Sequence, residues 1–401
     1  MTSRRRFLAR SLRDSTLIAL APTLPGFLAR TAHAAVAQKD GRILVVVQLD
    51  GGNDGINTVV PFKDEGYRKY RKTTRLREER LIKVDGEVGL HPAMGDAGEL
   101  LESGRLAIVQ GVGYPSPNRS HFRSREIWQS ARFDPLDQTG LGWIGRALDG
   151  GPRPPDGAPG ALLIGPDSPP PALRGRRSVA AALDRLDDFA LADGAGSSLK
   201  EAGRAEDEIG TFLCRSFLDA YVTADRLDSV AKAEAAQGTY PESELARRLL
   251  LTARLIKAGL GTRVYYLEQG DYDTHGHQLA RHAPLLADLS GALKAFLDDL
   301  AAARLADRVV VLVFSEFGRR VEENGSKGTD HGTAGPVFLA GPGVRAGLVG
   351  PAPRLLDLQD GDLKMAIDFR RVYATVLEGW LGLPSHEALG EVFEPLPLFR
   401  A

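Results

Sequence analysis

Apolar residues are grouped along the chain in two patterns. Unbroken runs rich in β-branched residues have the length and composition of strands buried on both faces, and they lie at 42–49, 106–110, 161–164, 263–267, 309–314 and 336–340. Longer segments carry apolar residues three or four positions apart, as amphipathic helices do, and they lie at 93–103, 123–132, 242–259, 282–304 and 368–382. Strands separated by helices predict an α/β fold: a largely parallel sheet with helices on both faces.

Two stretches between these elements differ from the rest. Residues 148–176 are rich in glycine and proline, which is typical of a loop-rich connection. From about 176 to 260 the apolar spacing is mainly helical, with Leu245, Leu249 and Ile256 on one face of its clearest helix. We therefore predict a helical insertion at about 176–260 within a single domain that spans 35–401.

The composition is that of an ordinary globular protein. Of the 401 residues, 43% are hydrophobic and 26% are charged, which is enough apolar material for a large core. The formal net charge of −1 gives no reason to expect binding to nucleic acid. Cys214 is the single cysteine, so the chain can form neither an internal disulfide nor a cysteine-based zinc site.

Residues 1–34 have the features of an export signal. Residues 3–8 read Ser-Arg-Arg-Arg-Phe-Leu, a moderately apolar run follows at 17–28, and Ala32-His33-Ala34 has the small-x-small pattern of a cleavage site. The apolar run is too short to span a membrane easily, and no other segment of the sequence reaches that length. Because the paired arginines before Phe7 resemble a twin-arginine signal, we expect a protein exported to the periplasm or beyond.

Polar residues cluster directly after several predicted strands. In open α/β sheets, chemistry gathers beyond the carboxyl ends of the strands, and carboxylates and imidazoles grouped there are natural ligands of a divalent metal. The alternative is a set of ordinary turns, which Asp, Asn and Gly also form readily. The clusters are Asp50, Asn53 and Asp54 after 42–49; Asp271, Asp273 and His275 after 263–267; Glu316 and Arg319 after 309–314; and Asp330 with His331 before 336–340.

Ser120 lies where a helix is expected to begin, just after Asn118 and Arg119. Serine often caps a helix N-terminus. A hydroxyl there can equally act as a nucleophile or a metal-binding group, because the helix dipole and the free N–H groups favour an anion. The sequence leaves both interpretations open. The basic and polar segment at 63–85 is interpreted as a solvated excursion from the domain.

The order of these motifs resembles a known bacterial family, domain of unknown function 1501. The similarity covers essentially the whole mature chain and includes the export signal. That family looks like a distant branch of the alkaline phosphatase and sulfatase superfamily, which implies an alkaline-phosphatase-like fold. The motifs that carry the resemblance are Asp50-Gly-Gly-Asn-Asp, Asn118-Arg-Ser-His-Phe, Asp273-Thr-His, Ser315-Glu-Phe-Gly-Arg and Asp330-His-Gly.

The superfamily's chemistry implies a role for individual residues. Its members hold two divalent metals beside a nucleophile, and the resemblance implies that Ser120 attacks phosphorus or sulfur. Arg319 and, less strongly, Asn53 would hold the non-bridging oxygens of the substrate. Phe317 departs from the pattern, because the superfamily has a metal-binding histidine at that place. The implied metal ligands are Asp50, Asp273 or Asp271, His275, Glu316, His331 and its neighbour Asp330.

Taken together, these features predict an exported, metal-dependent hydrolase of phosphate or sulfate esters. Its substrate would be a small molecule or a polymer, and its metal would be zinc, manganese or calcium. The alternative is a non-catalytic envelope protein that keeps the fold as a binding or assembly module, with an envelope protein as its partner and a structural metal. The order of the five motifs favours the enzyme, whereas Phe317 favours the alternative.

Overall fold

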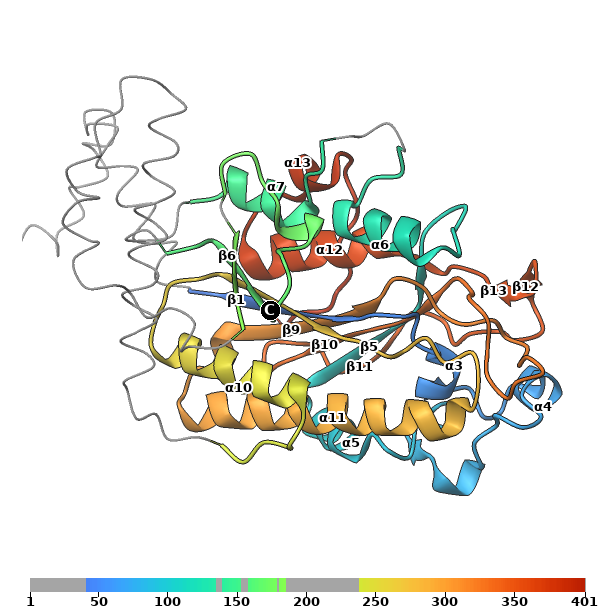
Figure 1. Ribbon diagram of the computed structural model, residues 1–401. Helices are drawn as coiled ribbons and strands as arrows, with labels where there is room; N and C mark the ends of the chain where they lie inside the picture. The colour runs from blue at the N-terminus through green and yellow to red at the C-terminus, as the bar shows by residue number, and fades with distance from the viewer. Residues whose placement is uncertain (1–40, 135–138, 153–157, 179, 185–237, 401) are drawn as a thin grey trace, which may run out of the picture. The chain divides into compact units, whose positions relative to one another are not determined.

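The described residues of this computed structural model, 41–134, 139–152, 158–178, 180–184 and 238–400, form a nine-stranded central sheet (Figure 1). The strand order is β11–β5–β10–β9–β1–β8–β6–β7, and β14 pairs with β5. Within this sheet, as far as the structure describes it, only β10 runs antiparallel to its neighbours, so the predicted largely parallel sheet is confirmed. The strands are β1 (Ile43–Leu49), β5 (Leu106–Gly113), β6 (Ala161–Ile164), β7 (Ala180–Leu183), β8 (Val264–Gln269), β9 (Val309–Ser315), β10 (Gly335–Ala340), β11 (Gly347–Val349) and β14 (Ile367–Asp368).

Helices cover both faces of the sheet, as predicted (Figure 1). Val45 and Val47 of β1 pack into one hydrophobic core, and Leu44 and Val46 pack into the other. Successive residues of a strand point to opposite faces, so an unbroken apolar run is what a strand between two helical layers requires. The first layer contains α5 (Gly95–Glu102), α10 (Glu244–Lys257) and α11 (Gln278–Ala302); the second contains α6 (His121–Ser130), α7 (Trp143–Gly150), α12 (Phe369–Ala374) and α13 (Ser385–Leu389).

The segment at 176–260 is described only in part. Where the sequence predicts a helical insertion, the described residues contain β7, which is an edge strand of the sheet, and α10, which packs in the same core as α11. Both therefore belong to the main domain. The rest of the predicted insertion, Cys214 and the predicted export signal lie outside the described residues.

The segment that follows β1 forms a small three-stranded sheet of its own. Its strands are β2 (Val59–Val60), β4 (Gly89–Leu90) and β3 (Ile82–Lys83), and α3 (Gly55–Thr58) and α4 (Glu65–Tyr70) accompany them. The interpretation of 63–85 as a solvated excursion is wrong for part of this segment. Tyr67 and Arg71 are 2% and 0% exposed, because the Tyr67 hydroxyl donates to Asn57 of α3 and Arg71 donates to the Val321 carbonyl of the main domain.

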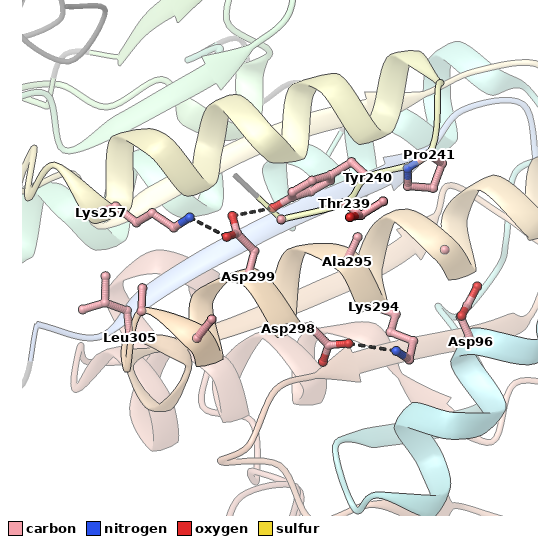
Figure 2. Close-up of a pocket in the computed structure, with 14 residues that line it drawn as sticks. Asp96, Thr239, Tyr240, Pro241, Lys257, Lys294, Ala295, Asp298, Asp299 and Leu305 are labelled. Atoms are coloured by element: carbon pink, nitrogen blue, oxygen red, sulfur yellow. Dashed lines mark hydrogen bonds and ion pairs between the residues drawn. The ribbon is translucent and has the colours of Figure 1, made fainter. Parts of the chain in front are cut away.

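A cavity of about 980 Å³ lies along α10 and α11 (Figure 2). The carboxylate of Asp299 accepts hydrogen bonds there from the Tyr240 hydroxyl at 3.1 Å and from Lys257 at 2.5 Å. Lys294 is paired with Asp298 at 2.8 Å. These charged groups therefore neutralise one another in two pairs. No helix among the described residues is both long and apolar enough to cross a membrane.

Candidate metal centre

Three neighbouring parallel strands end at the same level of the sheet. Leu49, the last residue of β1, is paired with Gln269 of β8 and with Ser315 of β9. The loops that follow therefore leave the sheet side by side, at its carboxyl edge. Glycine allows the close packing of two of these loops. Gly51 has a φ of 114°, and a Cβ at this position would lie 2.5 Å from the backbone nitrogen of Asp273.

Three histidines from different loops have their Nδ1 atoms held by protein acceptors. Ionised carboxylates and a backbone carbonyl can only accept hydrogen bonds, so each Nδ1 donates its hydrogen and Nε2 is the ring atom turned toward the site. Such a partner at the far ring nitrogen is typical of histidines that bind metals. The pairs are His121 with Glu316 Oε1 at 2.8 Å, His275 with Asp330 Oδ1 at 3.0 Å, and His331 with the Arg119 carbonyl oxygen at 2.8 Å.

The three Nε2 atoms converge on the carboxylate of Asp273. Its Oδ1 lies 3.0 Å from Nε2 of His275, 3.3 Å from Nε2 of His331 and 3.7 Å from Nε2 of His121. The Nε2 atoms of His275 and His331 are 2.9 Å apart. Ligand atoms of tetrahedral zinc are about 3.3 Å apart when the bonds are about 2.0–2.1 Å long. His121, Asp273 and His331 lie close enough to hold a metal ion, and Nε2 of His275 adjoins Asp273 and His331. These four residues are called the His/Asp cluster below.

The charges of the cluster are suited to a cation. Burial acts to raise the pKa of Asp273, but the hydrogen bond and the positive charge of Arg319 hold this pKa below its ordinary value. Burial also acts to raise the pKa of Glu316, but the hydrogen bond from His121 helps to hold this pKa below its ordinary value. Burial lowers the pKa of His331. At neutral pH the carboxylates are therefore ionised, and His331 is a neutral imidazole that can donate a lone pair.

Glu316 and Asp330, which the sequence predicts as ligands, lie behind the imidazoles instead. Oε1 of Glu316 accepts hydrogen bonds from His121 and, at 3.0 Å, from the backbone N–H of Gly51, while its Oε2 accepts one from Ser315 at 3.0 Å. Asp330 supports His275 in the same way. These carboxylates therefore orient the imidazoles. The ligand that sequence reasoning misses is His121, whose only signal is its position at the first residue of a helix after a motif loop.

Arg319 also has a different place from the one that the sequence predicts. Its side chain is 1% exposed, and all three of its nitrogens donate to the protein. Nε binds the carbonyl of Gly52 at 2.7 Å, Nη1 binds that of Thr329 at 2.8 Å, and Nη2 binds Asp273 Oδ1 at 2.6 Å. Arg319 therefore fixes the three strand-end loops to one another, and its guanidinium is not presented to a substrate.

The remaining predicted residues differ in how close they come to the cluster. Asn53 is 2% exposed, and its side-chain oxygen accepts hydrogen bonds from Thr58 at 3.0 Å and His282 at 2.8 Å, away from any substrate. Asp271 is exposed, has a φ of 70° and is not part of the cluster. Asp50 is paired with Arg125, and burial, together with the nearby Glu316, raises its pKa.

Ser120 precedes α6 and has its backbone held between two residues of the site. The Arg119 carbonyl before it binds His331, and His121 after it binds Glu316. Ser120 is exposed, and its hydroxyl makes no capping hydrogen bond to the helix that it precedes. The simple capping interpretation of this serine is therefore wrong, which leaves its hydroxyl available for chemistry.

Phe317 is buried under the cluster rather than beside a ligand position. Its ring centroid lies 4.9 Å from that of His121 and 4.9 Å from that of His331, and the residue is 3% exposed. The phenyl ring supplies no ligand atom. It packs against the faces of two imidazoles and, with their Nδ1 partners, limits their rotation.

Two further histidines, His91 and His282, are buried beneath the site and make the protein sensitive to acid. Burial lowers the pKa of His91 to about 4 and that of His282 to about 3. Between pH 6.5 and 4 the unfolded chain takes up protons that the native protein does not, so the free energy of unfolding should fall as the pH falls through this range. The loss should reach about 3 kcal/mol for His91 alone.

This pH dependence can be measured by urea unfolding at pH 7 and pH 5 with a chelator present, so that metal release does not contribute. Replacing His282 with Gln should reduce the pH dependence by about 2 kcal/mol over that interval. An unchanged pH dependence in this variant would mean that His282 titrates normally in the native state.

Comparison with known proteins identifies a family. A family model described as "Protein of unknown function (DUF1501)" matches residues 42–392. No curated protein matches the sequence significantly.

Several solved structures are similar to this chain at low identity. A PsFucS1 sulfatase from Pseudoalteromonas sp. is 10% identical, with a TM-score of 0.41 and coverage of 90% of this chain and 72% of that chain. A protein in the alkaline phosphatase superfamily from Vibrio parahaemolyticus is 11% identical, with a TM-score of 0.36 and coverage of 77% and 62%. The lipoteichoic acid synthase LtaP from Listeria monocytogenes is 10% identical, with a TM-score of 0.36 and coverage of 81% and 74%. The function has to be argued from the site itself.

Proposed function

The chain belongs to the DUF1501 family, and we propose that it is a metal-dependent hydrolase of phosphate or sulfate esters. The observation that carries this proposal is the arrangement of the three imidazoles. Each is held at Nδ1 by a protein acceptor, and each turns Nε2 toward Asp273. Nε2 of His275 and Nε2 of His331 are 2.9 Å apart and both adjoin Oδ1 of Asp273, so a cation among these atoms would be bound by all three side chains.

The donor set favours some metals over others. His121, His275 and His331 offer nitrogen, and Asp273 offers oxygen. Imidazole nitrogen suits zinc and other transition metals, whereas calcium takes oxygen ligands only. Of the candidates zinc, manganese and calcium, we therefore propose zinc first and manganese second.

Ser120 is the proposed nucleophile. Its Oγ would form a bond to the phosphorus or sulfur of the ester while the bond to the leaving alcohol breaks, with the serine proton passing to water and the alcohol taking one up. Water then attacks the same atom, the bond to Oγ breaks, and Ser120 recovers its proton. A bound metal would supply positive charge that lowers the pKa of the hydroxyl and stabilises the transferred group. His121 and the Arg119 carbonyl hold the serine beside that charge.

The test is hydrolysis of a panel of aryl phosphates and aryl sulfates by metal-replete mature protein. We expect turnover of at least one ester, and Ser120→Ala should lower kcat by more than about 10³-fold without loss of metal. Ser116→Ala, in an exposed serine of the same loop, is the matched control and should leave kcat unchanged. A Ser120→Ala variant as active as the parent would exclude this nucleophile.

We propose in addition that the protein is exported through the twin-arginine pathway and acts outside the cytoplasm. The support is the run Ser3-Arg4-Arg5-Arg6-Phe7-Leu8 with the small-x-small pattern of Ala32-His33-Ala34. Replacing Arg4 and Arg5 with lysine should leave the chain in the cytoplasm and uncleaved. Cell fractionation of both forms measures this, and export of the double variant at the parent level would contradict it.

A second candidate is a non-catalytic envelope protein with a structural metal, which binds another envelope protein. Two observations favour it: the guanidinium of Arg319 is fully used within the protein, and Phe317 supplies no ligand. For this candidate, removal of the metal lowers stability while the metal-loaded protein hydrolyses no ester.

A further inference from the structure

The carboxylate of Asp50 is bound by a guanidinium. Nη2 of Arg125 contacts Asp50 Oδ1, and the two side chains are 35% and 32% exposed. Asp50 directly follows β1, next to Gly51, whose N–H binds Glu316. The resemblance implies a metal ligand at Asp50, but a cationic side chain of the protein already lies at this carboxylate.

Glu316, the other carboxylate on this side of the site, offers no oxygen to a second metal either. The residue is 0% exposed, and its two oxygens accept three hydrogen bonds, from His121, the Gly51 N–H and Ser315. A second metal would have to reach a carboxylate that is fully buried and already bonded at both oxygens, beside an Asp50 that is paired with Arg125. The residues at this position therefore do not fit a second metal.

Helix geometry explains how Arg125 reaches Asp50. Arg125 lies four residues after His121 on α6, so both side chains project from the same face of the helix. His121 enters the His/Asp cluster from this face, and Arg125 projects beside it one turn further along. The guanidinium is a fixed charge, because arginine does not lose its proton in proteins.

We propose that Arg125 takes the place of a second cation, so that this site binds a single divalent metal. The charge of the guanidinium neutralises Asp50, while its exposed part faces solvent next to the His/Asp cluster. As an extension that rests on the proposed hydrolase function, an anionic group of the substrate lies between the metal and Arg125. Arg125, rather than Arg319, then binds its oxygens.

Metal counting tests the first part independently of activity. The metal-loaded mature protein, analysed by elemental analysis and by titration with zinc, should hold one zinc per chain. Asp50→Asn should also hold one, with a Kd within about threefold of the parent, because the substituted amide fills the same space and the carboxylate that it replaces is not a ligand. Two tightly bound metals in the parent, or loss of the metal in Asp50→Asn, would overturn the proposal.

Binding of inorganic phosphate to the zinc-loaded protein tests the second part. Arg125→Gln should weaken phosphate binding by about 10- to 100-fold at unchanged zinc content, and Arg125→Lys should restore part of it. Arg123→Gln is the matched control, because Arg123 on the same helix is bound to Glu126 and to the Phe133 carbonyl, both at 2.7 Å. Phosphate binding that is the same in Arg125→Gln as in the parent would overturn this part.

These results remain distinguishable from failure of the hydrolase proposal. If the parent and Asp50→Asn each hold one zinc but hydrolyse no ester, the single-metal inference stands and the hydrolase function falls. If Ser120 is catalytic but the parent holds two metals, the hydrolase function stands and the single-metal inference falls.

Discussion

Replacing His331 with alanine is expected to remove the metal and to abolish ester hydrolysis while the native fold is kept. Nε2 of His331 lies between Nε2 of His275 at 2.9 Å and Oδ1 of Asp273 at 3.3 Å, so its loss takes a ligand from the centre of the His/Asp cluster. Removal of a group that only supports a ligand costs about 10–100-fold in metal affinity. Loss of the ligand itself should therefore cost more than about 100-fold, measured by competition with a chelator.

The fold should survive this substitution because the His331 side chain is 23% exposed and lies at the edge of the protein core. His386→Ala is the control: this histidine side chain is 60% exposed on α13 and contributes nothing to the cluster. A His331→Ala protein that keeps its metal at parental affinity would refute the proposed centre. The structural-metal candidate is favoured by a different combination of results. In that case His331→Ala loses the metal, the free energy of unfolding falls by about 4 kcal/mol at a metal concentration of about 1,000 Kd, and the parent protein hydrolyses no ester.

Three of the four cluster residues can be predicted from the sequence for a simple physical reason. Strands buried on both faces must be continuously apolar, so the runs before Asp273 and after His331 mark strands of the sheet. Parallel strands bring their carboxyl ends to one edge, where Asp273 and His275 follow β8. His331 reaches the same edge because it precedes β10, which runs antiparallel to β9. Asp273, His275 and His331 are accordingly found together.

The remaining site residues depend on side-chain directions that a linear pattern does not contain. His121 comes from a helix rather than from a strand end, and Arg125 lies among charged neighbours that look like an ordinary solvated helix face. Arg319 follows a strand as predicted, but its guanidinium turns inward and binds the buried carbonyls of Gly51 and Gly52. A guanidinium at this place in the sequence can bind either a substrate or the protein itself. Its direction depends on where hydrogen-bond acceptors lie in the folded structure.

The direction of the Arg71 side chain also cannot be predicted from the sequence pattern. Arg71 lies in a polar segment, yet its side chain and that of Asp54 are both 0% exposed. Nη1 binds Asp54 Oδ2 at 2.5 Å and Nη2 binds Oδ1 at 2.9 Å, while Nε and Nη2 also bind the carbonyls of Val321 and Arg320. The pair thus joins the loop after β1 to the loop that follows Arg319.

Asp54→Ala is expected to lower the free energy of unfolding by about 3–5 kcal/mol, because it leaves the guanidinium of Arg71 buried without a counter-charge. The double variant with Arg71→Met should be more stable than Asp54→Ala alone, since the uncompensated charge is then absent. Urea unfolding of both single variants and the double variant measures the coupling between Asp54 and Arg71.

Asp357→Ala is the control. It breaks the exposed pair with Lys364 and should change the free energy of unfolding by no more than about 1 kcal/mol. A loss under about 1 kcal/mol in Asp54→Ala would mean that water or backbone movement already compensates Arg71.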